Sequence, residues 1–177
     1  MRKEYGKVLR SRFLRRMRDL VPEFEEEKVK SIYLAPGERA FSKLNSDGSK
    51  CWVVLCPSPK DYDEFTVLIG WSVFGRYPEL SMIPSNIWPS QDRSEFDQKE
   101  YLTRLPQLWT DQDTWWVIES FEPALGVEQI QAKMQPISQE VAQARVVPQV
   151  ENAISRLIEV GMPYLHLFTK SREAFGG

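Results

Sequence analysis

The sequence predicts an α+β fold, in which an antiparallel meander of about four strands packs against an N-terminal helix and C-terminal helices. Apolar residues recur at helical spacing over residues 2–21, strand-like runs separated by turn residues extend to residue 73, and helical spacing returns near the C-terminus. The length of 177 residues, with 42% apolar and 27% charged residues, is typical of one globular domain. We therefore predict a single domain over residues 1–177 that needs neither a disulfide nor a structural metal.

A basic amphipathic helix is predicted over residues 2–21. Its large apolar side chains recur every three or four residues and so share one face: Tyr5, Leu9, Phe13, Met17 and Leu20. Lysines and arginines occupy the rest of its surface. Pro22 ends the helix, and the acidic run 23–27 is predicted to be a solvated bend.

Four strands are predicted to follow. The first is Val29–Leu34, and Arg39–Leu44 and Lys50–Leu55 flank a turn-forming Asn-Ser-Asp-Gly sequence as a hairpin. The fourth, Phe65–Val73, is rich in β-branched and aromatic residues.

Prolines interrupt the sequence from residue 74 to residue 123, which excludes a long regular element there. A short helix is predicted at Ser94–Leu105, and Thr114–Ile118 is predicted to be a short strand or a buried extended segment.

The C-terminal third returns to helical spacing. Short helical stretches are predicted at Val127–Met134 and Ser138–Ala144, followed by a longer helix at Val147–Val160. Gly161 is predicted to cap this helix, because Pro163 follows two residues later.

The two cysteines, Cys51 and Cys56, are predicted to remain free thiols. They are five residues apart on one predicted strand, so their side chains point to opposite faces and do not pair. Two free thiols fit a reducing compartment, and the chain shows neither a secretory signal nor an apolar run long enough to span a bilayer. We therefore expect a cytoplasmic protein without a membrane segment.

The middle of the chain is acidic and rich in tryptophan. Residues 57–128 hold 13 acidic residues against 5 basic ones, a balance of −8, and four of the six tryptophans, Trp88, Trp109, Trp115 and Trp116, lie in its part from residue 84 to residue 128. Acidic charge attracts a basic partner over distance, and tryptophan is a frequent anchor in protein interfaces. The predicted partner-binding residues are Trp88, Asp92, Glu95, Asp97, Trp109, Asp111 and Asp113. Trp115 and Trp116 are adjacent, so only one of them can face the core of an extended segment.

Catalytic motifs are absent from the sequence. The single histidine, His166, lies in an apolar segment, and no glycine-rich phosphate loop or nucleophile elbow occurs. No catalytic residue, metal or cofactor is therefore predicted. One alternative remains an enzyme with a carboxylate-bound metal, because acidic residues lie close together in three places: Asp61 and Asp63; Asp92, Glu95 and Asp97; and Asp111 and Asp113.

Nucleic-acid binding through the first helix is the other alternative. Eight lysines and arginines lie between residues 2 and 18, a density that suits contact with phosphates. They surround every non-apolar side instead of forming one stripe, and the acidic run 23–27 follows them. The sequence therefore favours a solvated helix surface over a nucleic-acid partner.

The order of elements resembles the bacterial "domain of unknown function 4304" family. The resemblance lies in the basic first helix, the runs 39–43, 51–55 and 65–71, and the closing helix of residues 147–165. Some proteins of this type lie beside polymorphic toxins as immunity proteins, so the resemblance implies a binding role without catalytic residues. We therefore expect a non-enzymatic bacterial protein, most specifically an immunity protein that neutralises a cognate toxin by occluding its basic active-site cleft. The sequence leaves the oligomeric state open.

Overall fold

The computed structural model describes residues 1–30, 33–60, 62–80, 82–120, 131 and 135–175. The described elements are α1 (Lys3–Leu20), β1 (Glu25–Glu27), β2 (Arg39–Leu44), β3 (Lys50–Pro57), β4 (Asp63–Ser72), η1 (Pro84–Asn86), η2 (Ser94–Asp97), β5 (Glu100–Arg104), η3 (Leu105–Leu108), β6 (Trp116–Glu119), α3 (Gln139–Arg156), the π-helical segment η5 (Leu157–Gly161) and α4 (Met162–Phe175). The predicted α+β class is confirmed.

One antiparallel sheet of six strands forms the centre of the molecule. Its order is β1-β2-β3-β4-β5, and β6 pairs with the start of β4, at residues 63–65, which β5 leaves free. The meander was predicted with about four strands. β1 and β5 extend it at its two edges, and the predicted short segment near residue 116 supplies β6.

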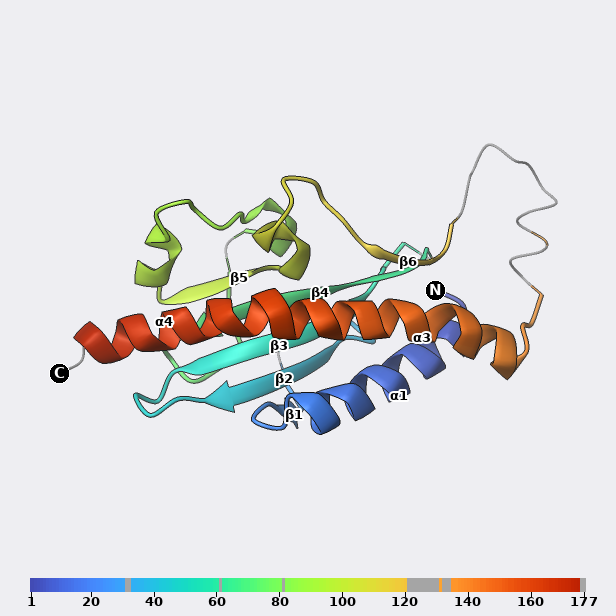
Figure 1. Cartoon of the computed structure of the whole chain (residues 1–177), viewed down its shortest axis with the longest axis horizontal. Helices are drawn as coiled ribbons and strands as arrows, with labels where there is room; N and C mark the ends of the chain where they lie inside the picture. Colours follow the sequence, from blue (N-terminus) through green and yellow to red (C-terminus); the bar gives the residue numbers. More distant parts are fainter. Residues whose placement is uncertain (31–32, 61, 81, 121–130, 132–134, 176–177) are drawn as a thin grey trace.

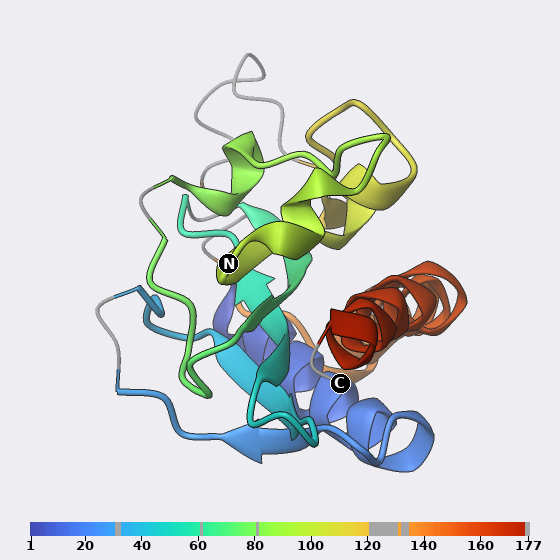
Figure 2. The ribbon, with the colours of Figure 1, turned by 90° about the vertical axis from the view of Figure 1, so that its left-hand side faces the viewer.

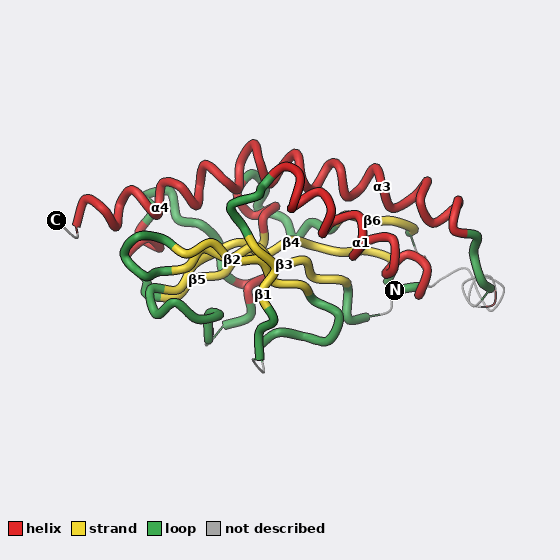
Figure 3. The backbone as a smooth tube through the Cα atoms, turned by 90° about the horizontal axis from the view of Figure 1, so that it is seen from below, coloured by secondary structure: helices red, strands yellow, loops and turns green. Residues whose placement is uncertain are grey.

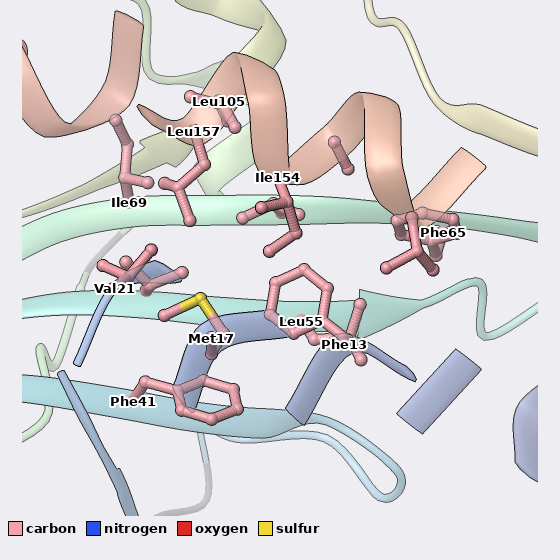
Figure 4. Packing of buried hydrophobic residues seen from close by; sticks show 14 of the residues in the cluster. Phe13, Met17, Val21, Phe41, Leu55, Phe65, Ile69, Leu105, Ile154 and Leu157 are labelled. Carbon is pink, nitrogen blue, oxygen red and sulfur yellow. The ribbon is translucent and has the colours of Figure 1, made fainter. Parts of the chain in front are cut away.

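Helices α1, α3 and α4 cover one face of the sheet, which we call the helix-covered face (Figures 1 and 3). The odd-numbered residues of β3 and β4 point into this core, as Leu55 and Ile69 do. Phe13 and Met17 of α1 and Ile154 of α3 converge with them between helices and sheet (Figure 4). Burial of these fully enclosed side chains is the main source of the fold's stability.

Loops cover the opposite face, which we call the loop-covered face (Figures 2 and 3). Even-numbered strand residues form a smaller cluster there, with Trp52 and Leu102 at its centre and Tyr77 from the loop after β4. The indole of Trp52 packs edge-on against Tyr77, with the ring centres 5.3 Å apart. Cys51 and Cys56 are free and lie in the two different clusters, as the alternation of strand side chains predicted.

Two strand predictions near the N-terminus were wrong. Residues 25–27 form the edge strand β1 and not a bend, because their backbone pairs with β2. The carboxylates of Glu26 and Glu27 also form ion pairs with Arg39 and Lys50 of β2 and β3. The predicted strand Val29–Leu34 is not observed in its described residues. Val29 and Leu34 pack instead against the cluster of the loop-covered face.

The predicted helix Ser94–Leu105 was also wrong. A short 3₁₀ turn, η2, occupies its beginning, and β5 pairs with β4 along its second half. The free edge of β4 offers backbone hydrogen bonds that a local helical preference does not outweigh.

The C-terminal helices are continuous and not split. Residues 139–156 form α3 with Pro148 inside it, and Gly161 belongs to the π-helical segment instead of capping a helix. A Cβ atom on Gly161 would lie 2.9 Å from methyl groups of Leu105 and Leu157, so glycine allows the close approach to η3. The predicted stretch Val127–Met134 lies outside the described residues apart from residue 131. No helix within the described ranges is both long and apolar enough to cross a membrane.

Candidate functional site

All seven predicted partner-binding residues lie in residues 82–115, which we call the cover segment. It contains η1, η2, β5 and η3 and gathers along the β5 side of the sheet, away from β1 and β2 (Figure 1). The cover segment holds six acidic and three basic residues, a balance of −3.

The buried side chain of Gln107 links two parts of the cover segment through hydrogen bonds. Its amide nitrogen donates to the carbonyl of Ser85 at 2.9 Å, and its amide oxygen accepts from the backbone N–H of Arg104 at 3.0 Å. These bonds tie η1 to the end of β5. Trp88 lies three residues after Ser85 and Trp109 two residues after Gln107, so these hydrogen bonds hold the backbone close to both tryptophans in place.

Both predicted tryptophans are displayed at the surface. Trp88 is 40% exposed and Trp109 is 41% exposed. The ring of Trp109 contacts Trp116 edge-on, with centres 6.5 Å apart, and the guanidinium of Arg156 lies 5.6 Å from its centre. Trp109 is therefore held from the protein side while much of its indole faces outward. Of the adjacent pair, Trp116 is buried and Trp115 is half-buried, as predicted.

The exposed carboxylates fall into two groups at opposite ends of β5. Asp92 and Asp97 flank or lie in η2, and Asp111 and Asp113 follow η3. The strand that separates the two groups in the sequence, β5, has five residues and is about 17 Å long at 3.4 Å per residue. The backbone N–H of Ser94 donates to Asp92 at 3.1 Å, and this bond lowers the pKa of the Asp92 carboxyl. Asp113 forms an ion pair with Arg104.

The prediction that Glu95 contacts a partner is contradicted by its burial. Its side chain is only 3% exposed, and its carboxylate accepts hydrogen bonds from the backbone N–H of Ser90 at 3.1 Å and from the Tyr164 hydroxyl at 2.6 Å. Burial raises the pKa of Glu95, but the hydrogen bonds from Ser90 and Tyr164 outweigh it and the net shift is downward. Glu95 therefore fastens η2 to α4 and leaves three acids of the cover segment, Asp92, Asp97 and Asp111, exposed without an ion pair among the described residues.

A pocket of about 560 Å³ opens on the loop-covered face, beside the cover segment. Its floor consists of even-numbered strand residues, Cys56, Thr66 and Leu68, and the loops contribute its walls. A second pocket of about 340 Å³ adjoins it and is lined mostly by apolar residues such as Tyr77, Leu80 and Met82. Glu38, Leu68, Ile83 and Pro84 line both pockets. Sequence reasoning missed these pockets, although strand alternation does place the three floor residues on one face.

Arg104 and Trp115 form one wall of the larger pocket. The guanidinium of Arg104 lies 4.4 Å from the centre of the Trp115 ring and pairs with Asp113. Burial lowers the pKa of Arg104, and the negative charge of Glu64 nearby opposes that shift. In this wall Arg104 lies over the Trp115 ring, and Asp113 neutralises its charge. The wall thus links the acidic loop after η3 to the pocket.

The thiols and the single histidine are poorly placed for nucleophilic catalysis. Burial and the charge of Glu38 raise the pKa of the Cys56 thiol, which keeps it protonated at neutral pH. His166 is exposed and lines a different pocket of about 400 Å³ together with Cys51, whose pKa burial also raises.

The acidic pairs do not gather into a metal site among the described residues. No group of three or more His, Cys, Asp or Glu side chains is arranged there to hold an ion. Asp63 is fully buried and accepts a hydrogen bond from the backbone N–H of Arg2 at 2.7 Å, while Asp61 lies outside the described residues.

Several basic residues of α1 are engaged within the fold. Arg12 and Arg16 both pair with Glu151 of α3, at 2.6 Å and 2.8 Å, and Arg2 pairs with Asp63 and Glu119. These arginines join α1 to its neighbours, which leaves fewer free charges for phosphates than the sequence suggested.

Comparison with protein-family models, with curated proteins and with solved structures finds no match for this chain. The resemblance to the domain of unknown function 4304 family and the immunity role that it implies therefore stay predictions, and function has to be argued from the geometry of the molecule.

Proposed function

We propose that this protein is a protein-binding domain and that the cover segment contacts a basic partner protein. The observation that carries the proposal is the exposure of Trp88 and Trp109, at 40% and 41%, within an acidic segment whose backbone Gln107 holds in place. An indole fixed before binding loses little conformational freedom on association, and tryptophan is among the residues most often found as binding hot spots.

The two acidic groups suit a single interface. The strand between them is about 17 Å long. An interface of ordinary size covers about 800 Å² per partner, which corresponds to a disc roughly 30 Å across. One partner can therefore meet both ends of β5 at once. Negative charge at both ends would speed its approach and fix its orientation.

In its most specific form, the partner is a toxin and the domain is its immunity protein. The domain would occlude the toxin's basic cleft, with a tryptophan as the anchor and the aspartates in place of an anionic substrate. This role requires exposed side chains on a backbone held in place and a negative charge, and the cover segment has both. It requires no catalytic group.

The protein products of the reading frames that flank this gene are the natural probes. Each would be purified and titrated against the full chain by biolayer interferometry. We expect one of them to bind, and we expect Trp88→Ala or Trp109→Ala to weaken binding by about 30-fold, the scale of a hot spot worth 2 kcal/mol. The control is Leu44→Ala, which removes a 65% exposed side chain at the β2–β3 hairpin, remote from β5. The proposal is wrong if neither tryptophan variant differs from the control.

The exposed aspartates should act mainly on the rate of association. The triple variant Asp92→Asn, Asp97→Asn, Asp111→Asn is expected to lower the association rate about tenfold at low salt and to flatten its dependence on ionic strength. The matched control is the triple variant Glu23→Gln, Glu25→Gln, Glu140→Gln, which removes three exposed acids outside the cover segment. An unchanged association rate would remove the electrostatic part of the proposal.

A further inference from the structure

The larger pocket of the loop-covered face has an excess of negative charge. Five of its lining residues are charged: Glu38, Lys60, Glu64, Arg104 and Asp113. Asp113 already pairs with Arg104, whereas Glu38 and Glu64 make no ion pair with any residue that the structure describes. Apart from that ion pair, the lining holds these two carboxylates and the ammonium of Lys60, so the pocket keeps a balance of −1.

The floor of the same pocket carries a polar group without a partner. Thr66 is 1% exposed, and its hydroxyl has no hydrogen bond with any described residue. A buried hydroxyl in this state destabilises the fold, so proteins rarely keep one without a reason. Cys56 lies directly across from Thr66 in the β3–β4 register, and its thiol is neutral. The floor therefore offers a polar but uncharged contact below the two carboxylates.

We propose that this pocket binds an arginine side chain of the basic partner. This proposal rests on the proposed function and specifies an exposed arginine on the partner's surface. A guanidinium carries five N–H donors in one plane, which suits acceptors spread over several walls, namely Glu38, Glu64 and the Thr66 hydroxyl. Its weakly hydrated faces and aliphatic stem suit the apolar surfaces of Leu68, Ile83 and Pro84. A lysine ammonium is more strongly hydrated and has only three donors, so arginine fits better.

The position of the pocket agrees with this assignment. Asp113 and Trp115 belong to the cover segment and also line the pocket, so a partner docked on Trp109 and Asp111 lies beside its mouth. Glu38 and Glu64 are half-buried, and the Glu38 carboxylate already accepts a hydrogen bond from the backbone N–H of Ala35 at 2.7 Å. A partly desolvated carboxylate without a cation is a frequent feature of binding sites. Burial raises the pKa of Glu38, in keeping with a carboxylate that has no cation beside it.

The test uses N-acetyl-arginine methylamide as the probe and the full chain labelled with ¹⁵N. In about 150 mM salt, we expect saturable shifts of the amide signals of Thr66 and Arg104 with a millimolar dissociation constant, the range of a single side chain. The citrulline analogue has the same shape without the charge and should bind at least about fivefold more weakly, because hydrogen bonds to charged groups are roughly twice as strong as neutral ones. The lysine analogue should fall between them.

Two variants locate the site and one controls for net charge. Glu64→Gln should weaken arginine binding about fivefold, and Thr66→Val, which keeps the shape and removes only the unpartnered hydroxyl, should weaken it about threefold without unfolding the protein. Glu140→Gln in α3 makes the same charge change at an exposed residue outside the pocket and should have no effect. The proposal is overturned if arginine and citrulline bind equally, or if all three variants respond alike.

This experiment separates the two proposals, because it needs no partner protein. Saturable shifts at Thr66 that Glu64→Gln weakens about fivefold would support the arginine pocket even if Trp88→Ala and Trp109→Ala leave partner binding unchanged. If the tryptophan variants lose partner binding and arginine causes no shift at Thr66, the proposed interface is supported and the arginine pocket is rejected.

Discussion

The two faces of the sheet are built in different ways. Side chains on the helix-covered face, such as Phe13, Leu55 and Ile154, are 0% to 1% exposed and belong to one continuous cluster under three helices. The loop-covered face has a small cluster around Trp52, and beside it the sheet residues Thr66 and Leu68, which are themselves 1% and 7% exposed, line pockets that the loops leave above the sheet.

This difference separates the parts that stabilise the fold from those available for binding. On the helix-covered side, ion pairs join the helices to each other, as Arg12 and Arg16 of α1 do with Glu151 of α3. Glu38 and Glu64 on the other face are unpaired among the described residues. Proteins tolerate local destabilisation mainly where a ligand or partner uses it. The loop-covered face and the adjoining cover segment are therefore where we place function.

The largest difference should appear when matched apolar side chains are truncated. Phe13→Ala removes a fully buried ring that packs against Phe41 at 5.8 Å between ring centres, and should lower the free energy of unfolding by about 3–5 kcal/mol. Leu68→Ala removes a side chain that lines both pockets, where solvent can fill the space, and should cost only about 2 kcal/mol. Urea unfolding with an unchanged m-value measures both changes. Equal costs would mean that the two faces are packed alike.

A smaller effect is expected where the cover segment is fastened to the helices. Tyr164→Phe removes the 2.6 Å hydrogen bond to the buried Glu95 carboxylate and should cost about 1–3 kcal/mol. Glu95→Gln keeps an acceptor for the Tyr164 hydroxyl and should cost less. Amide hydrogen exchange should report faster local opening around η2 in Tyr164→Phe. Protection that stays unchanged in η2 would show that Glu95 does not hold this segment.

Local sequence pattern was sufficient for α1 and for β2 to β4. Phe13 and Met17 recur at helical spacing, and the odd separation of Cys51 and Cys56 placed them on opposite faces correctly. Residues 100–104 were misassigned because their state depends on the free edge of β4, which no local pattern reveals.

The same reason explains what was missed in the candidate site. Exposure of Trp88 and Trp109 agreed with the prediction, but the burial of Glu95 depends on Tyr164, 69 residues away in the sequence. The pocket was invisible for the same reason. Glu38, Thr66 and Arg104 come from three separate segments, and only the assembled sheet and loops bring them around one space.

The smallest predicted effect is a pair of pH dependences with opposite signs. Burial opposes ionisation of Glu119, but the hydrogen bond from Tyr5 and the charges of Arg2 and Arg145 outweigh it, so its pKa is lowered from 4.5. Stability from Glu119 is therefore present above pH 4.5 and is lost as the pH falls through its folded pKa. Glu119→Gln should be less stable than the wild type near pH 7, and this deficit should shrink on acidification.

Glu38 should behave in the reverse way. Burial raises its pKa above 4.5, although the backbone N–H of Ala35 and the Cys56 thiol donate to it. The unfolded chain therefore gives up this proton first, and the free energy of unfolding falls as the pH rises from 4.5 through the folded pKa. Glu38→Gln should remove that fall and be more stable than the wild type near pH 7, on the order of 0.5 kcal/mol, because no packed atom is lost. Urea unfolding between about pH 3 and pH 7 measures both variants. If Glu38→Gln were destabilised like Glu119→Gln, the Glu38 carboxylate would already be stabilised by a group of the free protein. That result would count against its role as an acceptor for a guanidinium.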